Sequence, residues 1–525
     1  MTGHVDTFVR DNLPPRDQWP ELRFTLPELQ FPGRYNASSI LDAAIDNKLG
    51  PRPAMHYLSI TYTYEMLLRS ACNIANVLKH DFGLVPGNRV LIHASNSMFS
   101  IPAWWGVFRA GGVAVGTMPM LRAPELAVIL EKAQVSHAII DSHLAAEFEN
   151  ARQQAPSLKH VINTDDLDQR MASAAGYCSA VKTTPDDPAL IAFTSGTTGK
   201  PKGCVHFHRD IAAMAETFSR HVLQPKASDV FIGTPPLAFT FGLGAGVVFP
   251  ANVGAATVVC PKPGFDVLAD TISQHKATTL FTSPTGYRAL MKQDLNKLTS
   301  LHTCVSAGEH LPKATSDQWF ERTGIRIIDG IGATEMIHIF VSARGDDIRP
   351  GATGKAVPGY EATLLDANDQ PFDGEGEGRL AIRGPTGCRY LADERQRNYV
   401  VNGWNVTGDL YRRDADGYFW YLARADDMII SSGYNIGAPE VENALLTHNA
   451  VSEAAVIGVP DEERGQIVKA FIVLKPGAST DARTLQNHVK QTIAPYKYPR
   501  AIEFVAELPK THTGKLQRFK LRENT

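Results

Sequence analysis

The sequence predicts an α/β protein followed by a small α+β unit, and three observations support this prediction. Short β-branched runs alternate with longer helical patterns over most of the chain. After about Gly376, aromatic, β-branched and turn residues become dense, and a helix followed by two strands comes after them. Such an order is typical of parallel sheets covered by helices, joined to an antiparallel region. With 525 residues, 43% of them hydrophobic, the chain has room for more than one domain.

The first region contains eight short apolar runs that we expect to be strands: residues 88–94, 111–117, 135–141, 159–164, 189–195, 277–284, 301–308 and 325–332. Segments such as 122–134 lie between them and have a helical pattern. The longest apolar stretch, 241–260, is interrupted by glycines, Pro250 and Asn252. We interpret it as two strand-like pieces and predict no membrane anchor.

After Gly376 the pattern favours antiparallel strands, with a hairpin turn at Asp414–Gly417. A helix with Pro439 in its first turn then leads into a strand, a turn and a second strand. This last unit has roughly a hundred residues, which is a plausible domain size. We expect the boundary near Ala423–Asp427, where charges interrupt the strand pattern.

Charge and cysteine usage exclude several functional classes. The net charge of −3 and pI of about 6.6 give no sign of a nucleic-acid or polybasic membrane partner. Six cysteines lack the spacing of a zinc site or a disulfide framework. The first residues have neither a basic start nor an apolar core of signal-peptide length. We therefore expect a cytoplasmic protein, a monomer or homodimer, that acts on small molecules.

Thr194–Gly203, "TSGTTGKPKG", combines glycine, hydroxyl groups and lysine. Glycine lets a backbone approach phosphate oxygens closely, hydroxyls add donors, and lysine adds charge. Pro201 follows Lys200, so the motif does not match the phosphate loop GxxxxGK[ST]. Composition alone leaves a polar linker open as an alternative.

The string itself resembles the phosphate loop of the adenylate-forming superfamily, which comprises acyl- and aryl-CoA synthetases, adenylation domains and luciferases. Further motifs follow in the family's order: "DGIGATE" at 329–335, "TGD" at 407–409, "ARADDMIISSGYNIGAPEVE" at 423–442 and "PKTHTGKLQR" at 509–518. The resemblance implies a large domain of α/β sheets with a β-barrel-like region, residues 1–425, and a small mobile α+β domain, residues 426–525. It also implies ATP, Mg²⁺ and coenzyme A.

The resemblance assigns Lys515, Thr334 and Glu335 to catalysis. Lys515 would bridge the acid and the α-phosphate, Thr334 would meet the α-phosphate, and Glu335 would bind the metal. Residues implied in ATP binding are Thr194, Ser195, Gly196, Thr197, Thr198, Gly199, Lys200 and Lys202 at the phosphates, Ala307, Gly308, Glu309, Asp329 and Gly330 at adenine, Asp409 at ribose, and Arg424 and Lys515.

The family rotates its small domain between two half-reactions, and Asp426 matches the hinge position. Ser432, Gly433 and Tyr434 match the segment that lines the coenzyme A tunnel. Arg464 and Lys497 are candidates for the coenzyme A phosphates, with solvated surface charge as the alternative.

The implied acid pocket comprises Ala238, Phe239, Phe241, Gly242, Ile331 and Gly332. The family's amino-acid-activating members place an Asp here to pair with the ammonium, and this chain has none, so we expect no amino-acid substrate. Aromatic and small residues suit a flat ring or an apolar chain. His338 could face the pocket or lie in the core, and we expect it in the core.

Residues 329–340, "DGIGATEMIHIF", are similar to benzoate-type CoA ligases, and the opening, "DNLPPRDQWPEL" at 11–22 with "LPELQFP" at 26–32, resembles 2-aminobenzoate (anthranilate) CoA ligases. We therefore expect an AMP-forming aryl-CoA ligase acting on 2-aminobenzoate. Benzoate, salicylate or a medium-chain fatty acid, transfer to a carrier protein, and a non-catalytic adenylate-binding protein are the alternatives.

Overall fold

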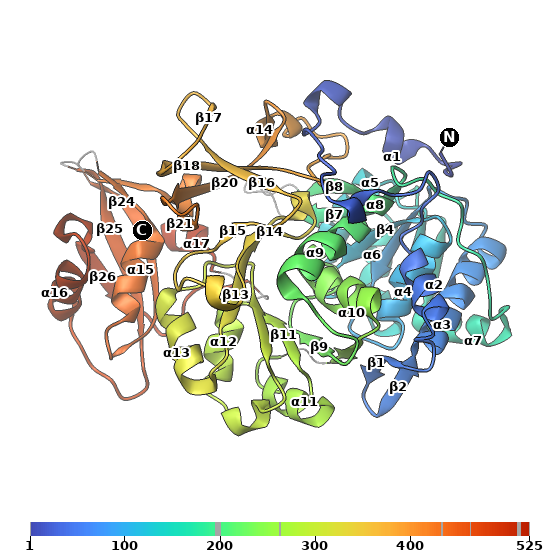
Figure 1. Cartoon of the computed structure of the whole chain (residues 1–525), viewed down its shortest axis with the longest axis horizontal. Helices are drawn as coiled ribbons and strands as arrows, with labels where there is room; N and C mark the ends of the chain where they lie inside the picture. The colour runs from blue at the N-terminus through green and yellow to red at the C-terminus, as the bar shows by residue number, and fades with distance from the viewer. Residues whose placement is uncertain are drawn as a thin grey trace.

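The computed structural model describes residues 2–194, 201–261, 264–431, 434–461, 464–511 and 516–523. Their strands form four sheets, arranged as two large helix-covered layers, an antiparallel sheet above them and a separate C-terminal unit (Figure 1). This is the predicted α/β class with a smaller α+β unit at the end.

The first large sheet has the strand order β6-β5-β3-β4-β7-β8. Its members are β3 (Arg89–His93), β4 (Val113–Thr117), β5 (His137–Ile140), β6 (His160–Asn163), β7 (Pro188–Thr194) and β8 (Lys202–Phe207). All pairs are parallel except β7 with β8, whose antiparallel register joins Thr194 to Lys202. The predicted phosphate loop therefore connects the two strands of a hairpin. Central strands β3 and β4 are buried along their whole length, as expected for parallel strands covered on both faces.

The second large sheet has the order β15-β14-β13-β12-β11-β9-β10-β1-β2. Its strands are β1 (Pro53–Tyr57), β2 (Ile60–Thr63), β9 (Val230–Gly233), β10 (Ala256–Val259), β11 (Thr279–Thr282), β12 (Thr303–Ser306), β13 (Ile327–Gly332), β14 (Ile339–Ser342) and β15 (Lys355–Ala356). The run from β1 to β13 is parallel and the edges are antiparallel. Residues 306–309 and 329–332 thus lie at the carboxyl ends of neighbouring parallel strands, where α/β sheets bind ligands.

Helices cover both sheets: α2 (Ser39–Asp46), α3 (Tyr64–Asn76), α4 (Ser100–Arg109), α5 (Ala123–Lys132), α6 (Ala145–Arg152), α7 (Thr164–Ser173), α8 (His208–Met214), α11 (Leu268–His275), α12 (Pro284–Leu290) and α13 (Lys313–Thr323), with the short α1 (Phe8–Asp11) before them. Local sequence explains several starts. Ser283 caps α12 through the Gly286 N–H, at 3.3 Å, and Pro284 occupies the first turn. The main core runs between the layers and includes the fully buried Trp104 and Trp105.

The expectation of two strand-like pieces in 241–260 is wrong for the first piece. Thr240–Leu243 is helix α9, Gly244–Val248 is a wider helical turn, and Phe249–Val253 is α10; only Ala256–Val259 is a strand. The glycines serve close packing here. A Cβ on Gly242 would lie 2.1 Å from the Pro236 carbonyl oxygen, and one on Gly244 would lie 2.7 Å from the His338 ring.

Where the sequence predicts a β-barrel-like region, the structure has an antiparallel sheet. This sheet includes the predicted hairpin. Its strands are β16 (Glu361–Leu365), β17 (Pro371–Phe372), β18 (Gly376–Arg383), β19 (Val400–Val401), β20 (Trp404–Arg413) and β21 (Phe419–Arg424), with α14 (Gln396–Tyr399) before β19. Asp414–Gly417 forms the turn between β20 and β21, and Gly417 has a φ of 80°, which favours glycine.

The last sheet uses only residues after Asp427 and has its own core. It contains β22 (Ile429–Ser431), β23 (Tyr434–Ile436), β24 (Val451–Asp461), β25 (Gly465–Leu474) and β26 (Ala501–Phe504), covered by α15 (Ala438–Leu446), α16 (Ala482–Thr492) and α17 (Arg518–Glu523). The predicted domain boundary falls in the short turn η10 (Ala425–Asp427), between β21 and β22.

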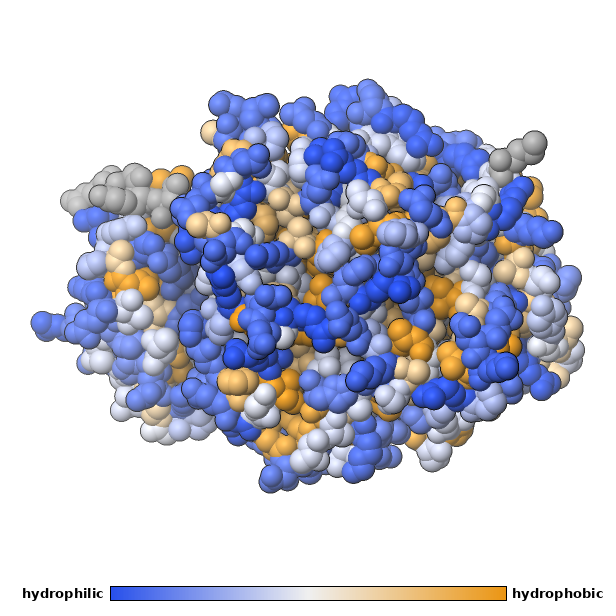
Figure 2. All heavy atoms as spheres, in the orientation of Figure 1, coloured by the Kyte–Doolittle hydropathy of each residue, from blue (hydrophilic) through white to orange (hydrophobic). Residues whose placement is uncertain are grey.

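Polar side chains cover most of the visible face, and apolar side chains appear there as scattered patches (Figure 2). Among the described residues, no helix is both long enough and apolar enough to span a bilayer.

Candidate active site

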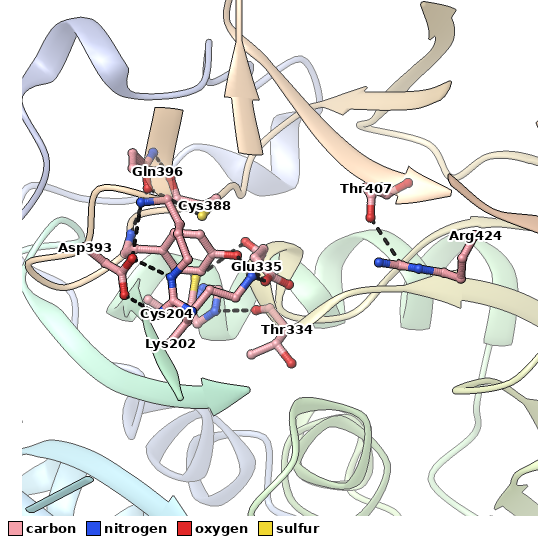
Figure 3. Close-up of polar contacts among 12 residues, drawn as sticks. Lys202, Cys204, Thr334, Glu335, Cys388, Asp393, Gln396, Thr407 and Arg424 are labelled. Atoms are coloured by element: carbon pink, nitrogen blue, oxygen red, sulfur yellow. Dashed lines mark hydrogen bonds and ion pairs between the residues drawn. The ribbon is translucent and has the colours of Figure 1, made fainter. Parts of the chain in front are cut away.

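One face of β8 lies against the Thr334–Glu335 turn. Because strand side chains alternate between faces, Lys202, Cys204 and His206 point the same way. Lys202 Nζ lies 3.7 Å from Glu335 Oε1, Cys204 Sγ lies 3.9 Å from the Glu335 carbonyl oxygen, and His206 Nε2 donates to the Thr334 carbonyl oxygen at 2.7 Å. The strand that leaves the phosphate loop therefore fixes the candidate catalytic turn (Figure 3).

Glu335 is nearly buried, at 7% exposure, and in the described part of the chain two side chains contact its carboxylate. One is Lys202, and the other is Tyr390, whose hydroxyl donates to Oε1 and accepts from Lys202 Nζ at 2.8 Å. Burial, together with the Glu335 charge, raises the pKa of Tyr390 far above its ordinary value, so the phenol stays a donor.

A single carboxylate beside the lysine that follows the predicted phosphate loop suits Mg²⁺ better than other metals. Among the described residues, no group of three His, Cys, Asp or Glu side chains could form a metal cage. Mg²⁺ is a hard cation that uses one or two carboxylates together with substrate phosphates and water. The donor set present here, Glu335 Oε atoms next to Lys202, fits that ion.

Sequence motifs did not reveal Tyr390, which lies on a segment that runs beside β8. Val205 N donates to the Arg389 carbonyl and Leu391 N to the Gly203 carbonyl, both at 2.8 Å, so 389–391 extends the sheet edge. The buried Gln396 amide accepts from Tyr390 N at 2.9 Å. Only this long-range pairing, which leaves no local pattern, places the tyrosine here.

A buried ionic network lies behind His206. Asp210 is fully buried and pairs with the equally buried Arg389, while His206 Nδ1 lies 3.6 Å and Arg209 Nε 3.8 Å from its carboxylate. Burial lowers the pKa of His206, but Cys204 and Asp210 outweigh it and raise the pKa to about 9. The imidazole is therefore protonated at neutral pH, and its Nε2–H is available for the Thr334 carbonyl.

The candidate ribose site is formed across the β20–β21 hairpin. Asp409 pairs in register with Arg424, whose Nη1 lies 3.0 Å from Asp409 Oδ1 and 3.3 Å from the Thr407 carbonyl oxygen. Asp409 is 8% exposed, so its carboxylate is largely ordered by the protein. Figure 3 draws Thr407 and Arg424 apart from the Glu335 cluster.

The candidate adenine residues lie at the ends of β12 and β13, on neighbouring strands. Gly308 has a φ of 88°, and a Cβ added to it would meet no described atom within 4 Å, so its backbone is accessible. Glu309 accepts a hydrogen bond from Thr285 at 2.9 Å. Burial raises the pKa of Asp329 to about 8, despite the Gly330 N–H and the Ser306 hydroxyl, so this carboxyl group holds its proton at neutral pH.

Phe241, a candidate residue of the acid pocket, belongs to an aromatic cluster. Phe241 lies 5.6 Å from Phe281 and 5.7 Å from His338, measured between ring centroids, and Phe249 meets His338 edge-on at 4.6 Å. Ala238, Phe239 and Gly242 belong to the same segment as Phe241, and Ile331 and Gly332 end β13. A Cβ on Gly332 would lie 2.8 Å from the His338 carbonyl oxygen, which explains the glycine.

His338 is buried in the core, as expected, but its ring is unusual. It is 3% exposed, and neither ring nitrogen makes a hydrogen bond of normal geometry to the described part of the chain. Burial lowers its pKa to about 3, although the nearby Phe241 backbone opposes the shift. The imidazole is thus neutral and lies against Phe241, a residue predicted for the acid pocket.

The two domains meet around His310. Its ring stacks on Tyr421 at 5.1 Å and its Nε2 lies 3.3 Å from Asn443 Nδ2 of α15. Burial and the Arg518 charge lower the pKa of His310 to about 4. Arg518, from the terminal motif, pairs with Glu442 at 2.7 Å.

Both candidates for the coenzyme A phosphates have partners inside the C-terminal domain. Lys497 Nζ pairs with Glu440 at 2.5 Å, and the Arg464 N–H donates to Asp461 at 2.9 Å near the β24–β25 turn. Neither contact brings these residues to the Glu335 cluster.

Several predicted site residues lie outside the described residues: Ser195, Gly196, Thr197, Thr198, Gly199, Lys200, Ser432, Gly433 and Lys515. The backbone of Asp426 lies in η10 and that of Tyr434 in β23; their side chains are not described.

Two family models match the chain. The model for AMP-binding enzymes matches residues 42–390, and the model for the AMP-binding enzyme C-terminal domain matches 440–515. A benzoate–CoA ligase of Thauera aromatica is 36% identical, with 95% of this chain and 98% of that protein covered. The mitochondrial acyl-coenzyme A synthetase ACSM3 of Mus musculus is 33% identical, covering 94% and 91%.

Solved structures of CoA ligases are also similar to this chain. The crystal structure of the anthranilate CoA ligase AuaEII in complex with anthranoyl-AMP has a TM-score of 0.91 and 36% identity, covering 95% of this chain and 99% of that one. A benzoate CoA ligase from Burkholderia xenovorans LB400 has a TM-score of 0.85 and 31% identity, covering 93% and 100%.

Proposed function

The chain belongs to the AMP-binding enzymes and is an acid–thiol ligase, and from that premise we propose that it is an ATP-dependent aryl-CoA ligase whose acid is 2-aminobenzoate. The observation that carries the acid assignment is the neutral imidazole of His338 in the aromatic cluster at Phe241, whose one polar neighbour among the described residues is the Phe241 backbone.

In the first half-reaction, the acid carboxylate would attack the α-phosphorus of ATP, giving an acyl-adenylate and pyrophosphate. Negative charge builds where the two anions meet, so preorganised donors and cations are the main demand on the protein. Lys202 and the loop before it would hold the β- and γ-phosphates, and Thr334 would donate to the α-phosphate. Lys515 would bridge the acid and the α-phosphate and so reduce their repulsion.

Glu335 would hold Mg²⁺, which when bound neutralises phosphate charge. The nearly buried carboxylate and its Oε1 contacts support this role. Asp409 would accept hydrogen bonds from the ribose hydroxyls, with Arg424 fixing its orientation at 3.0 Å. Residues 307–309, Asp329 and Gly330 would contact adenine.

In the second half-reaction, the coenzyme A thiol would displace AMP after the C-terminal domain rotates about Asp426. The separate core of residues after Asp427 and the short turn at the boundary support a rigid unit on a hinge. Ser432, Gly433 and Tyr434 would line the approach of the thiol arm. Arg464 and Lys497 are our candidates for the coenzyme A phosphates, and Lys497 would exchange its Glu440 partner for them.

An arylamine is mostly neutral at pH 7 and needs a hydrogen-bond partner more than a counter-ion. His338 supplies an acceptor, because its pKa of about 3 keeps the ring neutral. Phe241 and Phe281 offer apolar faces to an aromatic ring. The names of the similar proteins, a benzoate ligase and an anthranilate ligase, agree with an aromatic acid.

The test of the activity is a panel of acids. Pyrophosphate release is measured with 2-aminobenzoate, benzoate, salicylate and octanoate, with and without coenzyme A. We expect the highest kcat/KM for 2-aminobenzoate. Release with octanoate alone would contradict the aryl assignment and favour a medium-chain acyl ligase, and acyl-adenylate without thioester would favour a carrier protein as the acceptor.

The role of His338 is tested by the ratio of kcat/KM for 2-aminobenzoate to kcat/KM for benzoate. His338→Leu should lower kcat/KM for 2-aminobenzoate relative to benzoate by about tenfold, because one hydrogen bond to the amine is lost. Phe249→Leu, in the same cluster, is the control and should change both acids alike. A ratio unaffected by His338→Leu would remove the argument for the amine.

A further inference from the structure

The phenol of Tyr390 lies between two groups that the proposed first half-reaction needs. Its oxygen accepts from Lys202 Nζ at 2.8 Å and its O–H donates to Glu335 Oε1, while the Lys202 ammonium also lies 4.7 Å from the centre of the ring. Lys202 and Glu335 themselves are 3.7 Å apart. One side chain thus contacts both the lysine that ends the phosphate loop and the carboxylate of the catalytic turn.

Two features make this contact rigid. The backbone of Tyr390 is tied to β8 by the hydrogen bonds of its two neighbours and to Gln396 by its own N–H. Its ring packs edge-on against Tyr399 at 5.9 Å. A glutamate side chain loses conformational entropy when it is fixed in one orientation. Because Tyr390 already holds Glu335, less of this entropy is lost when the ligand binds.

Both described contacts of the Glu335 carboxylate fall on Oε1. The two donors, Tyr390 and Lys202, therefore hold the carboxylate of Glu335 by Oε1, and this fixes the direction in which Oε2 points. A metal ligand gains affinity when its orientation is fixed by an outer hydrogen bond.

We propose that Tyr390 is a positioning residue that sets the Glu335 carboxylate for Mg²⁺ and couples it to Lys202 at the phosphates. The inference rests on the proposed roles of Glu335 and Lys202. Tyr390 itself touches neither the reacting atoms nor the metal. It acts on the first half-reaction only, since thioester formation from acyl-adenylate needs neither the metal nor the leaving phosphates.

The test compares Tyr390→Phe with Tyr399→Phe. The first removes one hydroxyl and keeps the ring. The second keeps the ring packed against Tyr390 and removes a buried hydroxyl that has no hydrogen-bond partner among the described residues. Binding of the non-hydrolysable analogue AMPCPP is measured by calorimetry with MgCl₂ and with EDTA. Circular dichroism and thermal unfolding establish that both variants are folded.

For Tyr390→Phe we expect Mg²⁺-dependent binding of the analogue to weaken by about 10- to 100-fold, the effect of losing a hydrogen bond to a charged group. Binding in EDTA should weaken much less, and Tyr399→Phe should match the wild type. Equal weakening with and without Mg²⁺, or no weakening, would overturn the proposal.

Glu335→Gln separates this inference from the proposed function. If Tyr390 acts through Glu335, the double variant should lose no more Mg²⁺-dependent binding than Glu335→Gln alone. Independent, additive losses would overturn the positioning role. Unchanged Mg²⁺ dependence in Glu335→Gln itself would instead contradict the proposed metal ligand.

Discussion

Replacing Asp210 by asparagine should destabilise the N-terminal domain and disturb the catalytic turn. The substitution keeps the shape of the side chain and removes its charge. Arg389, with no exposed side-chain surface, would then have a buried charge without its partner, and His206 and Arg209 would lose the same anion. Removing one partner of a buried pair costs about 3–5 kcal/mol, because the remaining charge cannot be rehydrated.

The assay is urea unfolding of the variant against the wild type, followed by tryptophan fluorescence. Trp19 reports on this region, since its ring lies 5.7 Å from that of Phe207, which precedes α8. Asp416→Asn is the matched control. It breaks the pair between Arg349 and Asp416, which has a 2.8 Å separation but side chains 40% and 65% exposed, so we expect a change of about 0–1 kcal/mol.

A loss below about 1 kcal/mol for Asp210→Asn would refute the reasoning. The double variant Asp210→Asn with Arg389→Met gives a second check, since it removes both members of the pair. It should be at least about 1 kcal/mol more stable than the sum of the single changes predicts, and additivity within about 0.5 kcal/mol would show that the two residues do not interact.

Three further outcomes are expected. Lys515→Ala should slow adenylation by about 10²- to 10³-fold, the effect of losing one preorganised donor, and spare thioester formation from preformed acyl-adenylate; equal losses in both steps would contradict its role. Asp409→Ala should raise the KM for ATP by about 10- to 100-fold in steady-state assays, and Arg424→Met by less, because Arg424 acts on Asp409 at 3.0 Å. The pKa of His310 is lowered to about 4 by burial and Arg518, so the contact of His310 with α15 should be present above about pH 6.5 and be lost as the pH falls towards 4. The rate of hydrogen exchange in α15 should rise over the same pH range, and His310→Gln should remove this pH dependence.

Many strand positions were predictable because a buried parallel strand is a short apolar run between helical patterns, although the parallel strands β1 and β9 were not predicted. All eight predicted runs contain a strand, from β3 to β13. The contact between Lys202 and Glu335 was implied only by the family resemblance, since 133 positions separate two residues whose local surroundings say nothing about each other.

The errors and omissions have a physical origin. In 241–253, the glycines suggested breaks between strands, whereas Gly242 and Gly244 are there because a Cβ would collide with Pro236 and His338. Tyr390 and Asp210 were missed because their importance comes from partners far along the chain. For the network around Asp210, the local signal in the sequence is the spacing of four positions between His206 and Asp210.

The alternation of side chains along β8 limits how the enzyme could be redesigned. The loop between β7 and β8 could be lengthened or shortened before Pro201 without changing the face to which the side chains of β8 point. One residue inserted between Lys202 and His206 would turn the lysine or the histidine to the opposite face, so that the two could no longer contact Glu335 and the Thr334 carbonyl together. For any chimera that exchanges phosphate loops, the tolerated splice point therefore lies on the upstream side of this strand.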